Sequence, residues 1–129
     1  MEYEDLTEKI IGSAYRVYNT MGFGYLESVY EKCMLIELEQ VGLRAGAQQP
    51  IEVRYNGIPV GDFIADIMVE DTIIVELKSV RNLNPAHEAQ LVNYLVATGK
   101  PVGLLLNFGE SKVDVKRKVR SLKSDRITG

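Results

Sequence analysis

The chain has 129 residues, of which 46% are hydrophobic and 26% are charged, a balance typical of a soluble globular domain. This length predicts one domain, residues 1–129, with a core of its own. No apolar run approaches the ~20 residues of a membrane-spanning helix, and the acidic start does not resemble a signal peptide, so we expect a cytoplasmic protein. The chain has one cysteine, which excludes an internal disulfide. It also has only one histidine, and these two residues are too few for a structural zinc site.

Charge is distributed unevenly along the chain. Residues 112–129 carry seven basic and two acidic side chains, for a net charge of +5, whereas the other 111 residues carry eight basic and sixteen acidic ones, for −8. A basic end can contact phosphates, although a solvated terminal tail is the alternative. The basic residues of this end are Lys112, Lys116, Arg117, Lys118, Arg120, Lys123 and Arg126.

Apolar spacing predicts two helices at the start of the chain. The first runs from about residue 5 or 7 to residue 20, and a glycine-rich break at 22–24 ends it. The second runs from about residue 26 to 41 and stops at Gly42. Its expected apolar side consists of Leu26, Val29, Cys33 and Ile36, with Cys33 as a small buried hydrophobe.

The middle of the chain predicts a meander of three antiparallel strands at about 51–55, 58–69 and 73–79. Residues 43–50 are expected to form a loop or an irregular entry to the first strand. Asn56-Gly57 is a strong signal for a type I′ turn. A helix follows, with Asn84 as its N-cap, Pro85 at its first position and Gly99 at its end.

The apolar run at 102–107 predicts a buried strand, parallel to strand 73–79 because a strand–helix–strand crossover is right-handed. Residues 113–115 suggest one more short strand. The element order is helix, helix, three strands, helix, strand, which indicates an α/β or α+β sandwich with a mixed sheet. On the third helix we expect an apolar face and a polar, aromatic stripe. The apolar face is Ala89, Val92 and Val96, and the stripe is His87, Gln90 and Tyr94.

Three charged residues lie inside the apolar hairpin at 63–79. Asp66 is in its first strand, and Glu76 and Lys78 share one face of the second. Such charges are costly in a core unless they are paired or bind metal. A three-residue loop at 70–72 would place Asp66 directly across from Glu76. The alternative is a structural Glu76–Lys78 ion pair, with Asp66 merely at a strand end.

The same hairpin predicts that apolar residues fill the opposite face of both strands. In the first strand these are Phe63, Ala65, Ile67 and Val69, and in the second they are Ile73, Val75 and Leu77.

Oxygen atoms in this hairpin suit a hard divalent cation such as Mg²⁺ or Mn²⁺. Asp66 and Glu76 could supply two carboxylates, and the backbone carbonyl of Leu77 a third oxygen. Lys78 could assist a water molecule or stabilise charge on a scissile phosphate.

Two further polar residues could complete this site. Glu27, in the first turn of the second helix, could reach the metal through a water molecule, although a carboxylate there also suits the helix dipole. Gln90 could orient a ligand or the phosphate, or it could be an ordinary satisfied polar residue. Tyr30 and Tyr94 are expected either to support the site or to be core aromatics with bonded hydroxyl groups.

These motifs together resemble the PD-(D/E)xK nuclease superfamily. Asp66 followed by Glu76-Leu77-Lys78 matches its motif, with Ala65 where the name of the superfamily has proline. The segment Gly24-Tyr25-Leu26-Glu27-Ser28-Val29-Tyr30 resembles the motif of the GxxExxY protein family, a branch of that superfamily. The likeness spans about residues 5–120. It implies a restriction-endonuclease-like core and hydrolysis of DNA or RNA with Mg²⁺ or Mn²⁺.

Three hypotheses about function follow from these observations. The first is a metal-dependent nuclease, an endonuclease or other phosphodiesterase. The second is a non-catalytic protein of the same fold that binds nucleic acid or a protein partner through the basic end. The third is an assembly protein whose buried charges only fix specificity. A chain this small has little surface for gripping a duplex, which favours a homodimer or a protein partner.

Overall fold

The computed structural model describes residues 3–120 of the chain. Its elements are, in order, helices α1 (Glu4–Met21) and α2 (Glu27–Gln40), strands β1 (Ala45–Tyr55), β2 (Ile58–Val69) and β3 (Ile73–Lys78), helix α3 (Pro85–Thr98), and strands β4 (Val102–Phe108) and β5 (Val113–Val119). Lys123 and Arg126, two residues of the basic end, lie outside the described residues. Among residues 3–120, no helix is both long and apolar enough to cross a membrane.

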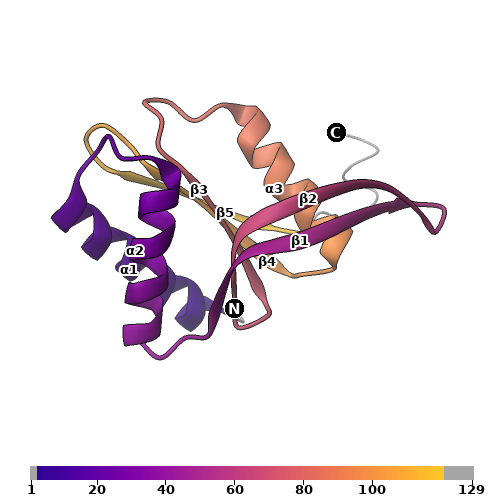
Figure 1. Cartoon of the computed structure of the whole chain (residues 1–129), viewed down its shortest axis with the longest axis horizontal. Helices are drawn as coiled ribbons and strands as arrows, with labels where there is room; N and C mark the ends of the chain where they lie inside the picture. Colours follow the sequence, from indigo (N-terminus) through magenta and orange to yellow (C-terminus); the bar gives the residue numbers. More distant parts are fainter. Residues whose placement is uncertain (1–2, 121–129) are drawn as a thin grey trace.

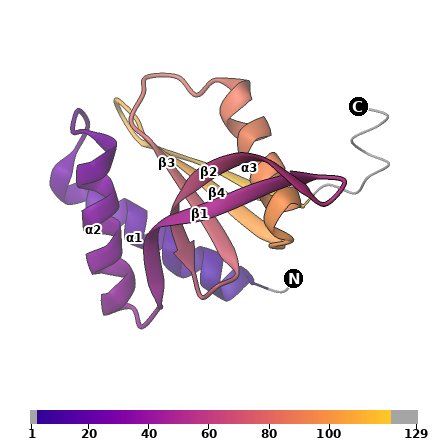
Figure 2. The same ribbon diagram turned by 45° about the vertical axis from the view of Figure 1, so that its right-hand side comes forward.

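The strands form one mixed sheet in the order β1-β2-β3-β4-β5. The pairs β1–β2, β2–β3 and β4–β5 are antiparallel, and β3 is parallel to β4 across the α3 crossover. Helices α1 and α2 cover one face of the sheet and α3 lies against the other (Figure 1), as a second direction of view also shows (Figure 2). The predicted meander, parallel crossover strand and α+β class are confirmed.

Two turns and one cap follow the local sequence. Asn56 and Gly57 both have positive φ angles, of 51° and 78°, as a type I′ turn requires. Val69 pairs with Ile73, so the β2–β3 loop has the three residues predicted for it. Helix α3 begins with Asn84 as N-cap, whose side chain accepts a hydrogen bond from the backbone N–H of Ala86 at 2.8 Å.

The predicted apolar side of α2 is wrong. The buried residues of this helix are Tyr30, Met34 and Leu38, whereas Ile36 is 59% exposed and Cys33 is only partly buried. Cys33 and Ile36 line a shallow groove against α1. Helix α2 therefore packs on two neighbours, and the side chains aimed at the sheet are more deeply buried than those aimed at α1.

The predicted apolar face of α3 is wrong for a similar reason. Leu91, Tyr94 and Leu95 are buried against the sheet, whereas Val96 is 42% exposed. Val96 and Ala89 instead line a groove beneath the β1–β2 hairpin. Packing on the sheet selects the leucines of α3, which are longer than its valine and alanine residues and reach the strands.

Two boundaries differ from the predictions. Strand β1 begins at Ala45, so most of the segment expected to be irregular is strand, although Gln48 within it has a φ angle of +54°. Strand β5 continues to Val119 and pairs with β4 along its length. Residues 116–118 therefore belong to the sheet and are not a solvated tail.

Candidate active site

Asp66 and Glu76 meet where the backbone pairing of β2 with β3 ends. The last backbone pair is Ile67 with Val75, and the same register places Asp66 opposite Glu76. There, the Asp66 carboxylate accepts a hydrogen bond from the backbone N–H of Leu77 at 2.8 Å, and the Glu76 carboxylate accepts one from the backbone N–H of Asp66 at 3.3 Å. Each carboxylate thus bonds to the backbone of the opposite strand. We call this reciprocal arrangement the carboxylate clasp.

The clasp holds Glu76 in an environment that disfavours its charge. The residue is 8% exposed, and its Oε1 atom is buried without a hydrogen-bond partner in the described structure. Burial is the main cause that raises the pKa of Glu76 to about 9, and a side-chain hydrogen bond and the charge of Asp66 raise it further. At neutral pH, the Glu76 carboxyl group is therefore protonated.

Lys78 lies half-buried, two residues beyond Glu76 on the same strand. Its charge lowers the pKa of Glu76, but this is the smallest of the influences on that group. Within residues 3–120, no ion pair joins the Lys78 ammonium to the Glu76 carboxylate. The geometry thus disfavours the alternative in which Lys78 exists to neutralise Glu76.

Asn107 supports this end of β3, and the sequence analysis missed it. It lies opposite Lys78 in β4 and is fully buried. Its side chain accepts a hydrogen bond from the backbone N–H of Val80 at 2.9 Å and donates one to the Val80 carbonyl at 2.8 Å. A lone amide inside the apolar run at 102–107 was the available signal. These two bonds fix the chain directly after Lys78.

The GxxExxY segment forms the connection between α1 and α2. Gly24 has a φ angle of +114°, which a residue with a side chain rarely adopts. The Tyr30 hydroxyl donates a hydrogen bond to the Gly22 carbonyl and accepts one from the backbone N–H of Tyr25 at 3.4 Å. The Tyr30 ring stacks on Phe108, with centroids 4.3 Å apart. Tyr30 is therefore a core aromatic with a bonded hydroxyl group, and it ties the loop to the core.

This loop presents Glu27 at the start of α2, where the side chain is exposed. Among residues 3–120, no group of three or more His, Cys, Asp and Glu side chains is arranged to hold a metal ion together. The structure thus brings Asp66 and Glu76 into contact without adding Glu27 to them, and the predicted role of Glu27 stays a prediction.

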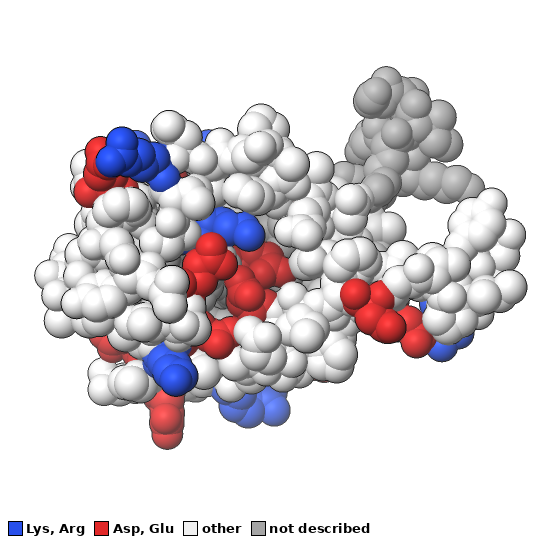
Figure 3. Space-filling view, turned by 45° about the horizontal axis from the view of Figure 1, so that its top comes forward, with Lys and Arg blue, Asp and Glu red and all other residues white. Residues whose placement is uncertain are grey.

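Helix α3 carries Tyr94 and Gln90, the two residues of this helix predicted to belong to the site. Tyr94 is 7% exposed, and burial, followed by the charges of Glu76 and Asp66, raises the pKa of its hydroxyl. The charges of both carboxylates therefore influence the pKa of the Tyr94 hydroxyl. Gln90, one turn earlier, is exposed, and its role also stays a prediction. Figure 3 shows acidic side chains gathered in a hollow near the middle of one face, with a basic group at the edge.

The first half of β2 does not follow the predicted alternation. Ala65 packs in the cluster beside α3, and the Phe63 ring contacts the Tyr94 ring at a centroid distance of 5.5 Å, whereas Ile67 and Val69 face α1 and α2. The prediction that all four residues share one face is therefore wrong. Strand β2 is paired with β3 only from Ile67 onward, so its preceding half is free to twist away.

Three basic residues in and next to β5 have partners within the fold. Lys118 forms an ion pair with Glu88 of α3 at 2.7 Å, and Lys112 lies 3.6 Å from Asp114. Arg120 donates a hydrogen bond to the Gly99 carbonyl at 3.0 Å. Contact with nucleic acid stays a prediction for Lys112, Lys116, Arg117, Lys118 and Arg120.

The oxygen atoms of the clasp fit a hard divalent cation. Mg²⁺ is usually held by one or two carboxylates, with water and substrate completing the shell. Oε1 of Glu76 is a buried acceptor without a protein partner. A second carboxylate, that of Asp66, lies against it. A cation would supply the missing partner and remove the repulsion between the two charges.

The family model described as the PD-(D/E)XK nuclease superfamily matches residues 4–118. The chain belongs to this superfamily, whose nucleases generally use divalent metals. No curated protein sequence matches the chain significantly.

Two solved structures share the fold. The crystal structure of SSO0001 matches with a TM-score of 0.59 and 17% identity, over 97% of this chain and 63% of the other, so this chain spans less than two thirds of that protein. An alkaline exonuclease from Laribacter hongkongensis matches with a TM-score of 0.50 and 13% identity, over 95% of this chain and 85% of that one.

Proposed function

We propose that this chain is a divalent-metal-dependent nuclease of the GxxExxY branch, acting on DNA or RNA. The observation that carries the proposal is the carboxylate clasp, which holds a buried glutamate oxygen without a partner beside a second carboxylate. A structural pair would leave no such oxygen, because an unsatisfied buried acceptor costs free energy.

Asp66, Glu76 and the backbone carbonyl of Leu77 would hold the cation, Mg²⁺ or Mn²⁺. The cation would polarise the phosphate and lower the pKa of a bound water. The Lys78 ammonium, half-buried and without an ion pair to Glu76, is available to stabilise charge that develops on the scissile phosphate. Glu27 and Gln90 are exposed on α2 and α3, where substrate can contact them.

The proton on Glu76 makes binding of the cation dependent on pH. Glu76 must lose its proton before both carboxylates can bind a cation, and its pKa is about 9 without one. Binding should therefore release a proton, and the apparent affinity should increase as the pH rises toward 9.

Calorimetric titration with MgCl₂ or MnCl₂ tests the cation site directly. We expect binding with proton release, and a melting temperature that increases with the metal concentration. Asp66→Asn and Glu76→Gln should abolish both effects while the metal-free proteins stay folded. Asp62→Asn is the matched control, because Asp62 lies in the same strand with an exposed side chain. A metal-induced shift that persists in both clasp variants would place the cation elsewhere.

Cleavage of single-stranded DNA, double-stranded DNA and RNA, each with Mg²⁺ or Mn²⁺, tests the activity. We expect cleavage by the wild-type protein and none by Asp66→Asn. Wild-type protein that binds nucleic acid without cleaving it would instead support the non-catalytic alternative.

A further inference from the structure

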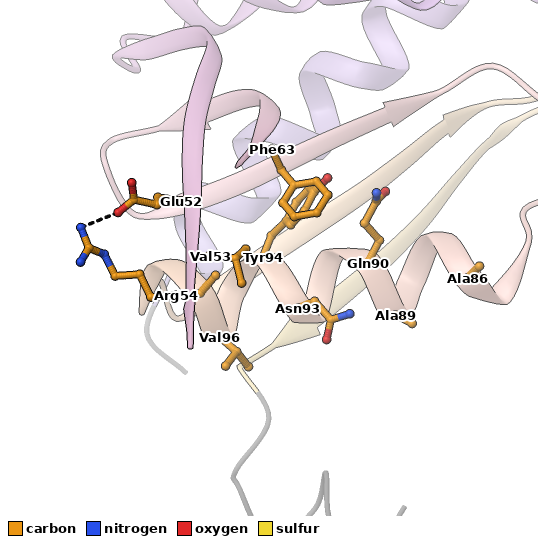
Figure 4. A pocket seen from close by; sticks show the side chains of 11 residues that line it. Glu52, Val53, Arg54, Phe63, Ala86, Ala89, Gln90, Asn93, Tyr94 and Val96 are labelled. Atoms are coloured by element: carbon orange, nitrogen blue, oxygen red, sulfur yellow. Dashed lines mark ion pairs between the residues drawn. The ribbon is translucent and has the colours of Figure 1, made fainter. Parts of the chain in front are cut away.

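A groove of about 680 Å³ lies between the β1–β2 hairpin and α3. Figure 4 shows its lining side chains, with Phe63 and Tyr94 on one side and successive turns of α3 along its length. Most of the lining is apolar or small. The lining includes Glu52, Arg54, Phe63, Gln90 and Tyr94.

Tyr94 connects the groove with the surroundings of the candidate active site. Tyr94 lines it, and the charges of Glu76 and Asp66 raise the pKa of the same side chain. Phe63 lies three residues before Asp66 on β2 and contacts the Tyr94 ring at 5.5 Å. A molecule in this groove would therefore lie beside a group bound at the clasp.

The charges of the groove exclude a phosphate as its main occupant. Its charged lining residues are Glu52 and Arg54, and these two form an ion pair of 2.6 Å. Among residues 3–120, the groove therefore offers no unpaired cation to an anionic group. It suits a flat, uncharged group with apolar faces and polar edges, because aromatic rings and the Gln90 amide line the same space.

Phe63 provides the surface for such a group. Its side chain is 43% exposed although it contacts Tyr94. Leaving a large aromatic side chain in this state costs hydrophobic free energy, which an occupant stacked on the ring would recover.

We propose that this groove binds the base of an unpaired nucleotide next to the scissile phosphate, so that the preferred substrate is single-stranded. The inference rests on the proposed nuclease function. A base inside a duplex has its faces covered by its neighbours and cannot stack on Phe63 without leaving the helix. An unpaired base has both faces available, and stacking on an aromatic side chain accepts any base.

A fluorescence experiment tests the contact itself. The chain contains no tryptophan, so Phe63→Trp introduces a single fluorophore into the groove. We expect a single-stranded oligonucleotide to quench its emission, and a strand of the same length made of abasic nucleotides to leave it unchanged. Equal quenching by both strands would show that the backbone, not the base, reaches the groove, and would overturn the proposal.

Binding affinities test the preference for single strands. Anisotropy titrations would use a labelled single strand and its blunt duplex, with Ca²⁺ in place of Mg²⁺ and the integrity of the strands checked on a gel. Phe63→Ala should weaken binding of the single strand by roughly 5- to 100-fold, the range expected for loss of one stacked base, and should leave duplex binding unchanged. Tyr15→Ala is the matched control, because Tyr15 lies on α1 and is 48% exposed.

The outcomes separate this inference from the proposed function. Metal-dependent cleavage that is insensitive to Phe63→Ala would overturn the groove inference and leave the nuclease intact. Base-dependent quenching without any cleavage would support the groove and contradict the nuclease. Self-association that Phe63→Ala disrupts, measured by sedimentation without nucleic acid, would show that a second copy of the chain fills the groove and would overturn the inference.

Discussion

The two faces of the sheet differ in how many buried hydrophobic residues they contain. Among residues 3–120, the cluster beneath α1 and α2 contains seventeen buried hydrophobic residues, and the cluster beneath α3 contains seven. The α3 side also carries Glu76, a buried carboxyl group, and the groove beneath the β1–β2 hairpin. The α1–α2 face thus contains most of the hydrophobic core. The α3 face has a groove and a buried glutamate whose charged form is destabilised.

Under the proposed function, this difference indicates where the chain gives up stability for chemistry. A sequence selected for stability alone would fill the groove and replace the acid by a hydrophobic residue of similar size. Of the superfamily motif, Glu76 and Asp66 influence Tyr94 of α3, whereas the Leu77 side chain packs in the cluster beneath α1 and α2. The predictions below test this division, beginning with the largest expected effect.

Removing a large aromatic side chain from each face gives the strongest contrast. Phe108→Ala, on the α1–α2 side, should lower the free energy of unfolding by about 3–5 kcal/mol, because the residue is fully buried and leaves a cavity. Phe63→Ala, on the α3 side, should cost about 1 kcal/mol or less, since Phe63 is 43% exposed. Urea denaturation measures both values. Equal losses would refute the division of the two faces.

Lys78→Ala tests whether the charge on the α3 side serves chemistry. We expect the rate of cleavage to fall by about 10²-fold or more, with the metal still bound, because the transition state loses a charge stabiliser. Lys32→Ala, on the exposed side of α2, is the control. If Lys78 were needed to neutralise Glu76, its removal would instead cost roughly 3–5 kcal/mol of stability, without a selective loss of turnover.

The pH dependence of stability tests the raised pKa of Glu76. The pKa of Glu76 is about 9 in the folded protein, against an ordinary value of 4.5. Between these values the folded state binds more protons than the unfolded one, so the metal-free protein should lose stability as the pH rises, by at most about 1.4 kcal/mol per pH unit. Glu76→Gln should flatten this slope in thermal melts, and Glu39→Gln, at an exposed position, should not. A wild-type curve that is flat across this range would contradict the raised pKa.

The smallest expected effect concerns the loop that joins the two helices. Tyr30→Phe keeps the stacking on Phe108 but removes the hydroxyl bonded to Gly22 and Tyr25. We expect a loss of about 1 kcal/mol in the free energy of unfolding. If the loop positions Glu27 for chemistry, cleavage should fall further than this loss of stability explains. A folded variant with unchanged cleavage would leave Tyr30 a purely structural role.

Much of the fold and the central pair could be predicted from the sequence, because the signals were local. The three-residue loop followed from the requirement that Asp66 and Glu76 meet, and the type I′ turn followed from Asn56-Gly57. The parallel strand followed from the handedness of crossovers. Each of these inferences depends on a short segment and a strong backbone preference.

The errors arose where several elements compete for one side chain. Periodicity identified an apolar stripe on α2 but could not show that α1 and the sheet divide the helix surface, with Met34 aimed at the sheet. It also could not show that β2 pairs with β3 only from Ile67 onward. The unpaired part of β2 turns Phe63 toward α3. Asn107 escaped notice because its bonds join segments 27 residues apart, a distance that no local pattern reports.

The carboxylate clasp has one more consequence, for observation by magnetic resonance. The backbone amide protons of Asp66 and Leu77 bond directly to the two carboxylates, so their chemical shifts should follow the charge on each. The two signals should move as the pH rises and the proton leaves Glu76, and in a different pattern when a cation takes its place. Two backbone amides of the unmodified protein thus form a natural pair of probes, which can report the occupancy of the site without a substrate, a label or turnover.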